Sequence, residues 1–336
     1  MEKHKIILDV DTANGMPVGD VDDGLAIAMA LAMPEFELLG CTTCGGNCRT
    51  HESTINTLRI LEMAGRGDIP VAEGRENPFL QDVSANFEYK KKRSERYMDF
   101  WKDMPPLAGP TISPSPLKAH EFIIEMVKKH PGEVTIVKEG SLTNLALALL
   151  VEPEITPLVK EVVHMGGRVG TIDWDAEEAK PTDTTLHVRR DILHTNTEFD
   201  PEATVIVIRS GIPFRFVTGI SRDVLLTPED VDRIEAVGTD FHTFLAQTSR
   251  PWVDFNIKIR YRAGAPMWDP FTLAVLADPD LCYFVGMRFH AERFRAREQP
   301  YLSISPDSPQ VGVSMGPVRL ETTRKMLLKA WTTPLS

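Results

Sequence analysis

Residues 6–33 decide the fold, and they read IILDVDTANGMPVGDVDDGLAIAMALAM. The stretch opens with an apolar run typical of a buried strand and closes with an apolar run of helical length. Between the two runs the chain gathers five aspartates, at positions 9, 11, 20, 22 and 23. A strand that leads through a polar turn into a helix is the repeating unit of a parallel sheet, so this stretch predicts an α/β fold.

The same alternation of short apolar runs with helical periodicity continues along the chain. It predicts an open, mostly parallel, Rossmann-like sheet with helices on both faces, and a single domain over residues 1–336, because no linker or repeat interrupts it. The expected strands are 5–10, 36–44, 133–139, 159–167 and 203–210, and the expected helices are 22–33, 50–65, 117–130, 142–153, 227–249 and 268–279. Residues 76–115 and 168–195 are long polar connections, a length typical of lids or binding loops.

The composition excludes several classes of function. Lysine and arginine number 37 against 48 acidic residues, and a net charge of −11 argues against a nucleic-acid partner. No window holds the roughly 18 apolar residues that a membrane span needs. The N-terminus lacks the apolar core of a secretory signal, so we expect a cytoplasmic protein. The four cysteines, Cys41, Cys44, Cys48 and Cys282, indicate packing rather than a disulfide framework.

The aspartates pose an electrostatic problem. In open α/β sheets ligands bind beyond the carboxyl ends of the strands, where Asp9 and Asp11 lie, and Asp22 and Asp23 open the helix that follows. The helix dipole favours one or two carboxylates by about 0.3–1 kcal/mol each, but not four like charges in one small volume. A divalent cation resolves the repulsion. We expect Ca²⁺, because it accepts about six to eight oxygen ligands, whereas Asp20 is interpreted as a solvated turn residue.

A fifth carboxylate comes from the segment GAPMWDPFTLAVLAD, where Asp269 precedes a proline and an apolar helix. An aspartate before proline is commonly a helix cap, and that interpretation stands beside the metal one. Asp269 nevertheless lies at a helix start, which is where a site at the sheet edge would gather ligands.

Several motifs, in order along residues 5–280, resemble the nucleoside hydrolase family of inosine/uridine-preferring enzymes and their relatives. The family begins with Asp-x-Asp after a strand and then Asp-Asp before a helix, as Asp9, Asp11 and Asp22-Asp23 do here. The other similar segments are ELLGCTTCGGNC, DIPVAEGRENPF, GSLTNLALAL, VVHMGG, TNTEFDPEA and MWDPFTLAVLADP. The resemblance implies the nucleoside hydrolase fold and a homodimer or homotetramer.

The resemblance also implies a site. Ca²⁺ would be held by Asp11, Asp23, the backbone carbonyl of Thr143 and Asp269. Asp11 would act as general base toward a water acidified by the cation, and this water would attack the anomeric carbon of a ribose. The ribose hydroxyls would be bound by the side chains Asp22, Asn47 and Asn196, and Asp9 would orient the residues around the metal.

Two positions depart from the family pattern. Trp268 replaces a histidine that precedes the last metal ligand in many members. This resembles the purine-preferring, inosine-adenosine-guanosine branch, in which stacking on the base is thought to assist its departure. Trp268 is therefore a catalytic candidate, beside the interpretation that it only packs under the helix. His194 replaces a glutamate and is a candidate substrate contact, a replacement acid or an ordinary loop residue.

These features predict a calcium-dependent hydrolase that releases base and ribose from small-molecule nucleosides, with purine nucleosides favoured. Two alternatives stay open. One is a hydrolase of another N-riboside, with a pyrimidine, nicotinamide or modified base. The other is a non-catalytic, calcium-dependent nucleoside binder, against which the retention of Asp11 argues. A second aromatic could stack with Trp268, and residues 76–115 offer the candidates Phe79, Phe87, Tyr89, Tyr97, Phe100 and Trp101.

Overall fold

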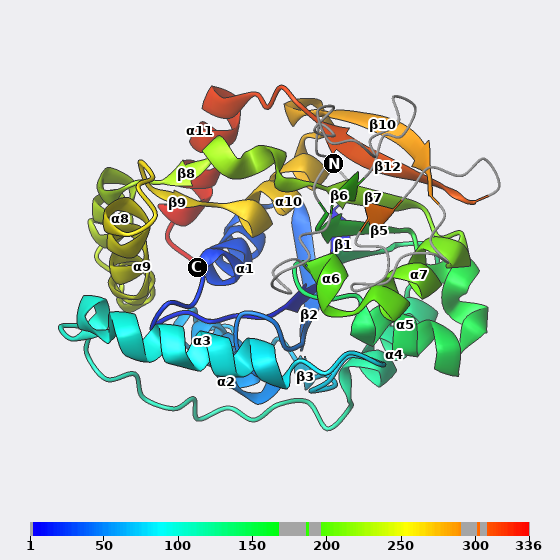
Figure 1. Ribbon diagram of the computed structural model, residues 1–336, viewed down its shortest axis with the longest axis horizontal. Coiled ribbons are helices and arrows are strands. Elements are labelled where there is room, and N and C mark those ends of the chain that lie inside the picture. The colour runs from blue at the N-terminus through cyan, green and yellow to red at the C-terminus, as the bar shows by residue number, and fades with distance from the viewer. Residues whose placement is uncertain (1–2, 168–185, 188–195, 290–300, 303–307, 336) are drawn as a thin grey trace, which may run out of the picture.

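The computed structural model describes residues 3–167, 186–187, 196–289, 301–302 and 308–335 (Figure 1). Within these residues the main sheet has eight strands in the order β10-β12-β7-β5-β4-β1-β2-β3. All neighbouring strands run parallel except β10 and β12. The predicted α/β fold with an open, mostly parallel sheet is confirmed. The strands of this sheet are β1 His4–Val10, β2 Phe36–Thr43, β3 Val71–Glu73, β4 Val134–Lys138, β5 Glu161–Met165, β7 Phe214–Val217, β10 Tyr283–Arg288 and β12 Gln310–Met315.

Two short pairs lie outside the main sheet, β8 (Leu225–Leu226) with β9 (Ala265–Pro266) and β6 (Leu186–His187) with β11 (Tyr301–Leu302). The helices are α1 Asp22–Ala32, α2 Thr50–Met63, α3 Ser84–Tyr97, α4 Ala119–Lys129, α5 Thr143–Val151, α6 Asn196–Phe199, α7 Pro201–Ser210, α8 Pro228–Glu235, α9 Asp240–Lys258, α10 Trp268–Ala277 and α11 Leu320–Trp331. Short 3₁₀ turns span Met98–Trp101, Pro153–Leu158, Gly219–Asp223 and Pro279–Leu281. In the described part of the chain, no helix has both the length and the apolarity to cross a bilayer.

The helices cover both faces of the sheet, as predicted (Figure 1). One buried cluster joins the sheet to α1, α2, α8, α9, α10 and α11, and a second joins it to α4, α5 and α7. Successive residues of a strand point to opposite faces, so Leu8 and Val10 enter the first cluster and Ile7 enters the second. The organisation of residues 1–336 as one domain stays a prediction.

The expected strand at 203–210 is wrong, because these residues form α7. Residues 203–210 are rich in β-branched residues, which favoured a strand. Two residues that precede this segment favour a helix instead. Asp200 caps the helix by accepting the backbone N–H of Ala203 at 3.1 Å, and Pro201 occupies the first helical position. The helix then buries Ala203, Val207 and Ile208 on one face, whereas Val205 and Ile206 are only partly buried.

Two other expectations need adjustment. The helix expected over 227–249 is two helices, α8 and α9, because Gly238 adopts a positive φ of 78° between them. Thr227 caps α8 and Pro228 is its first residue, as predicted. The connection 76–115 contains α3, whose sequence SANFEYKKKRSERY carries little apolar periodicity. Residues 168–185 and 188–195, most of the second long connection, lie outside the described residues.

Candidate active site

A cavity of about 2350 Å³ opens at the carboxyl ends of the parallel strands. Its lining takes at least one residue from the end of each central strand, among them Asp11 after β1, Asn47 after β2, Glu139 after β4, Gly166 after β5 and Thr218 after β7. This is the edge at which ligands bind in open α/β sheets. The first turns of α1 and α10 and the side chains of α3 and α9 complete the wall.

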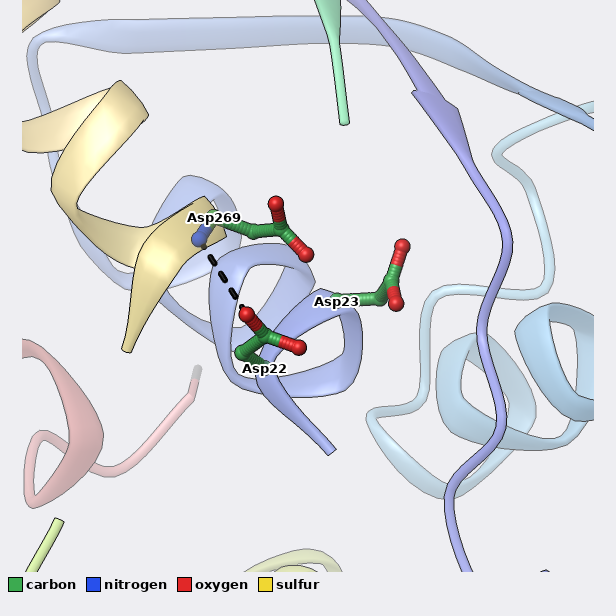
Figure 2. Close-up of side chains that lie close together, drawn as sticks. All are labelled: Asp22, Asp23 and Asp269. Carbon is green, nitrogen blue, oxygen red and sulfur yellow. Dashed lines mark hydrogen bonds between the residues drawn. The ribbon is translucent and has the colours of Figure 1, made fainter. Parts of the chain in front are cut away.

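Three carboxylates meet where α1 and α10 begin (Figure 2). Asp22 and Asp23 lie in the first turn of α1, and Asp269 lies in the first turn of α10. One oxygen from each lies within 4.8 Å of the others, a spacing that suits a metal ion. Asp22 Oδ2 also accepts the backbone N–H groups of Trp268, at 3.2 Å, and Asp269, at 3.4 Å. The two helix N-termini are thus tied together by one carboxylate.

Asp11 lies beside this cluster and is held by Asn47. Asn47 donates its backbone N–H to Asp11 Oδ2 at 2.8 Å and its side-chain amide to Asp11 Oδ1 at 2.9 Å. The backbone N–H of Asp11 donates to Asp23 Oδ1 at 2.9 Å. Gly46 allows this approach, since a Cβ at that position would lie 1.7 Å from Asp11 Oδ2. Of the two aspartates at the end of β1, Asp11 is the one that faces the cavity.

Burial gives these acids an electrostatic cost. It raises the pKa of Asp11, and it raises the pKa values of Asp22, Asp23 and Asp269 well above the usual range. The neighbouring acids raise the pKa values of Asp22, Asp23 and Asp269 further. The ammonium group of Lys90 favours ionised Asp11, but burial lowers the pKa of Lys90 itself. An all-oxygen donor set that cannot ionise together without a cation fits a hard divalent metal ion.

A further carboxylate, Glu139, was missed from the sequence. It follows β4 in the cavity wall and is 1% exposed. Burial raises its pKa well above the usual range, and the charges of Asp11 and Asp9 raise it further. The signal was available, because the charged pair Lys138-Glu139 ends the mostly apolar run VTIV and directly precedes the GSLTN motif. A glutamate there is not expected unless it has a partner.

Asp9 points to the face of the sheet opposite to the one that packs against α1 and α10. It forms a fully buried ion pair with Lys138, which lies beside it in the register of β1 and β4. The Thr42 hydroxyl donates to Asp9 at 2.7 Å, and the Asn144 amide donates to it at 2.9 Å. Asp9 therefore orients Asn144, the residue after the expected metal ligand Thr143. This arrangement is compatible with the predicted orienting role, which stays a prediction.

The remaining predicted residues occupy three different settings. Thr143 is buried at the first position of α5, where its hydroxyl donates to Asp200 at 2.7 Å, and the metal-binding role of its carbonyl stays a prediction. Asn196 lines the cavity from α6, and its amide donates to the carbonyl groups of Met165, at 3.0 Å, and Glu139. His194 lies outside the described residues.

Trp268 lines the cavity and is only partly buried. Its ring passes close to Gly219, where a Cβ would lie 3.8 Å from Trp268 Cζ3. Among the described residues no aromatic ring stacks on it. Of the candidates from residues 76–115, the ones that also line the cavity are Phe87, Tyr89 and Tyr97, whereas Phe79, Phe100 and Trp101 do not.

The α9 side of the wall was not anticipated. Trp252 and Phe255 line the cavity with their rings stacked at 5.6 Å. The guanidinium groups of Arg93 and Arg260 lie over the Phe255 ring, at 5.3 Å and 5.5 Å from its centroid. Burial and the neighbouring Arg93 lower the pKa of Arg260 to about 10. This part of the wall is therefore aromatic and cationic, in contrast with the acidic end.

Known proteins share both this fold and this sequence pattern. The sequence model for the inosine-uridine preferring nucleoside hydrolases matches residues 6–327. The chain belongs to this family, whose members hydrolyse the N-glycosidic bond of ribonucleosides. The resemblance seen in the motifs is confirmed.

Individual relatives agree with this assignment. The protein named "Probable uridine nucleosidase 2" from Arabidopsis thaliana is 32% identical over 83% of this chain and 79% of its own length. The "Pyrimidine-specific ribonucleoside hydrolase RihA" of Shewanella baltica is 32% identical over 84% of this chain and 80% of its own. A solved structure titled "Plant nucleoside hydrolase - PpNRh1 enzyme" superposes with a TM-score of 0.77 at 25% identity, covering 98% of this chain and 99% of that one.

Proposed function

We propose that this chain hydrolyses ribonucleosides to free base and ribose with a bound Ca²⁺. The observation that carries the proposal is the meeting of the Asp22, Asp23 and Asp269 carboxylates within 4.8 Å of one another. Asp11 lies beside them, all four acids are buried, and burial raises the pKa of each. The expected ligands are Asp11, Asp23, Asp269 and the carbonyl of Thr143. Ca²⁺ suits them because it accepts carboxylate and carbonyl oxygens in loose geometry.

A bound cation would supply an acidified water and would stabilise developing negative charge. Asp11 is then the general base, since Asn47 fixes both of its oxygens next to the cluster. The water attacks the anomeric carbon through a transition state in which the ribose has oxocarbenium character, as in other glycoside hydrolyses; the bond from this carbon to the base breaks, and ribose and free base are released. Asp22, Asn47 and Asn196 line the cavity and are the proposed contacts to the ribose hydroxyls.

Purine ribosides are our first choice of substrate, because Trp268 presents a partly exposed ring beside Asp269 and a two-ring base stacks over more area. The names of the relatives favour a second candidate, the pyrimidine ribosides, because two proteins 32% identical to this chain are named for uridine or pyrimidine ribonucleosides. The resemblance also leads us to propose a homodimer or homotetramer, which light scattering of the purified protein would measure.

A panel of ribonucleosides tests the proposal. Chelator-treated protein is incubated with inosine, adenosine, guanosine, uridine, cytidine and nicotinamide riboside, with and without Ca²⁺, and free base is separated by chromatography. We expect base release that depends on Ca²⁺ and is fastest for the purine ribosides. Faster release from uridine and cytidine would select the pyrimidine candidate. Nucleoside binding without any base release would contradict catalysis and favour the binder.

A further inference from the structure

Glu139 is the buried acid of the cavity that neither the family resemblance nor the proposed mechanism uses. Its side chain is 1% exposed, and it lines the cavity at the end of β4. Among the described residues no group donates a hydrogen bond to either of its carboxylate oxygens. A carboxylate taken out of water without donors or a counter-charge costs several kcal/mol, so a residue in this position is expected to have a partner.

The direction of the side chain follows from strand alternation. Val137 belongs to the core cluster that packs against α1 and α10, so Glu139, two residues later, leaves β4 toward the same face. The N-termini of α1 and α10 present Asp23 and Asp269 on this face. Lys138 lies between Val137 and Glu139 in the chain and points to the other face of the sheet, where it pairs with Asp9.

The nearby charges exclude an ordinary ion pair. Asp11, Asp23 and Asp269 all interact electrostatically with Glu139, and every one of these interactions is repulsive. Lys138 is already occupied by Asp9, and the amine of Lys90 donates to the carbonyl of Gly46. The described residues thus offer Glu139 neither a hydrogen-bond donor nor a counter-charge, and a cation in the cavity would supply the counter-charge.

We propose that Glu139 is a further carboxylate ligand of the cation at Asp11, Asp23 and Asp269. This inference rests on the proposed function, because it needs that cation. The ligand set Asp11, Asp23, Asp269 and the Thr143 carbonyl contains three carboxylates. With Glu139 the site would contain a fourth carboxylate and therefore one more negative charge. An additional anionic oxygen strengthens the binding of Ca²⁺ and favours it over Mg²⁺, which tolerates fewer protein ligands.

The test compares Glu139→Gln with the matched variant Glu88→Gln. Glu88 also lines the cavity, but it is exposed on α3 and pairs with Lys92 at 3.5 Å. Chelator-treated proteins are titrated with Ca²⁺ by calorimetry. We expect the Kd of Glu139→Gln to rise about tenfold or more, because ligand charge sets calcium affinity, while Glu88→Gln stays within about twofold of the parent. Terbium bound in place of Ca²⁺ should carry about one more coordinated water in Glu139→Gln, measured from luminescence lifetimes in H₂O and D₂O.

Glu139→Asp keeps the negative charge but shortens the side chain by one methylene group. It replaces Glu139→Gln in the Ca²⁺ titration if the glutamine variant does not fold. It should also bind Ca²⁺ more weakly. Unchanged affinity and unchanged hydration in a folded Glu139 variant would overturn the inference and leave the proposed function intact. A parent protein that binds no Ca²⁺ would overturn both, and the two failures are therefore distinguishable.

Discussion

Asp22 and Asp269 lie 247 residues apart in the sequence, yet Asp22 Oδ2 accepts the backbone N–H of Asp269 at 3.4 Å (Figure 2). The same oxygen accepts the N–H of Trp268 at 3.2 Å. The bonds join the first turns of α1 and α10 and bring their carboxylates to one point. Each helix dipole favours negative charge at its N-terminus, so the two helices together offset part of the repulsion in the cluster.

The first prediction concerns the structural part of this contact. Asp22→Ala removes the acceptor for the N-terminus of α10 and should lower the free energy of unfolding by about 0.5–2 kcal/mol, as the loss of a helix cap does. Asp22→Asn keeps an acceptor oxygen and removes the charge whose burial raises the pKa of Asp22, so it should be at least as stable as the parent. Urea denaturation of the chelator-treated proteins measures both. Equal losses in the two variants would show that the charge of Asp22, and not its hydrogen bonds, matters for stability.

The second prediction concerns the general base. Asp11→Asn keeps the size of the side chain but removes the proton acceptor, so turnover should fall by about 10²–10⁴-fold. Asp11 is also a proposed ligand, so the comparison is made at saturating Ca²⁺; ribose or substrate affinity should then change far less, because the cavity keeps its shape. Steady-state kinetics on the best substrate of the panel, together with equilibrium binding, measures the two effects. Asp20→Asn, a change at a neighbouring acid of the cavity rim, is the control. Turnover of Asp11→Asn close to that of the parent would mean that another residue activates the water.

The third prediction concerns base preference. If Trp268 stacks on the departing base, Trp268→Ala should reduce kcat for inosine about three- to tenfold more than for uridine, because stacking contributes about 0.5–1.5 kcal/mol beyond area burial. Trp268→Phe, which keeps a ring, should lie between Trp268→Ala and the parent. Values of kcat and KM for both nucleosides provide the comparison. A uniform loss for both substrates with a lower melting temperature would identify Trp268 as a packing residue.

The fourth prediction concerns the buried ion pair of Asp9 and Lys138. Lys138→Met leaves Asp9 buried without its cation and should lower the free energy of unfolding by about 3–5 kcal/mol. The double variant Asp9→Asn with Lys138→Met removes both charges and should recover much of that loss. Denaturant unfolding of the parent, the single variants Lys138→Met and Asp9→Asn, and the double variant measures the coupling. No recovery in the double variant would show that Lys138 acts through packing alone.

The fifth prediction concerns pH. His164 is fully buried, and burial together with the charge of Lys138 lowers its pKa to about 3. An unfolded histidine titrates near pH 6.5, so between about pH 3 and 6.5 the unfolded chain binds a proton that the folded chain does not. The folded state therefore loses stability as pH falls through this range, by about 2 kcal/mol between pH 7 and 5 from this residue.

His164→Asn removes the titrating group and should show a correspondingly shallower loss. Denaturation at pH 5, 6 and 7 measures the slope, and His51→Asn is the control, because the His51 side chain is 74% exposed. A slope in His164→Asn equal to that of the parent would contradict a folded-state pKa near 3.

The order of the motifs was enough to predict much of this protein. The strand and helix of residues 6–33, the aspartates at the turn and the later segments GSLTN and MWDP led to the α/β sheet and to the family. These features are local, because periodicity, caps and motif spacing are properties of neighbouring residues. The same local reasoning failed at residues 203–210, where β-branched residues suggested a strand and the cap at Asp200 with Pro201 produced a helix.

The tertiary structure decided which carboxylates share a space. Asp9 and Asp11 are two residues apart, but the sheet pairs Asp9 with Lys138 on one face and turns Asp11 toward the cavity. Glu139 lines the same cavity as Asp11 because β4 lies beside β1 in the sheet. Charges act through space over a few ångströms, so their sum at a site depends on strand order and helix placement, which no single segment of the sequence encodes.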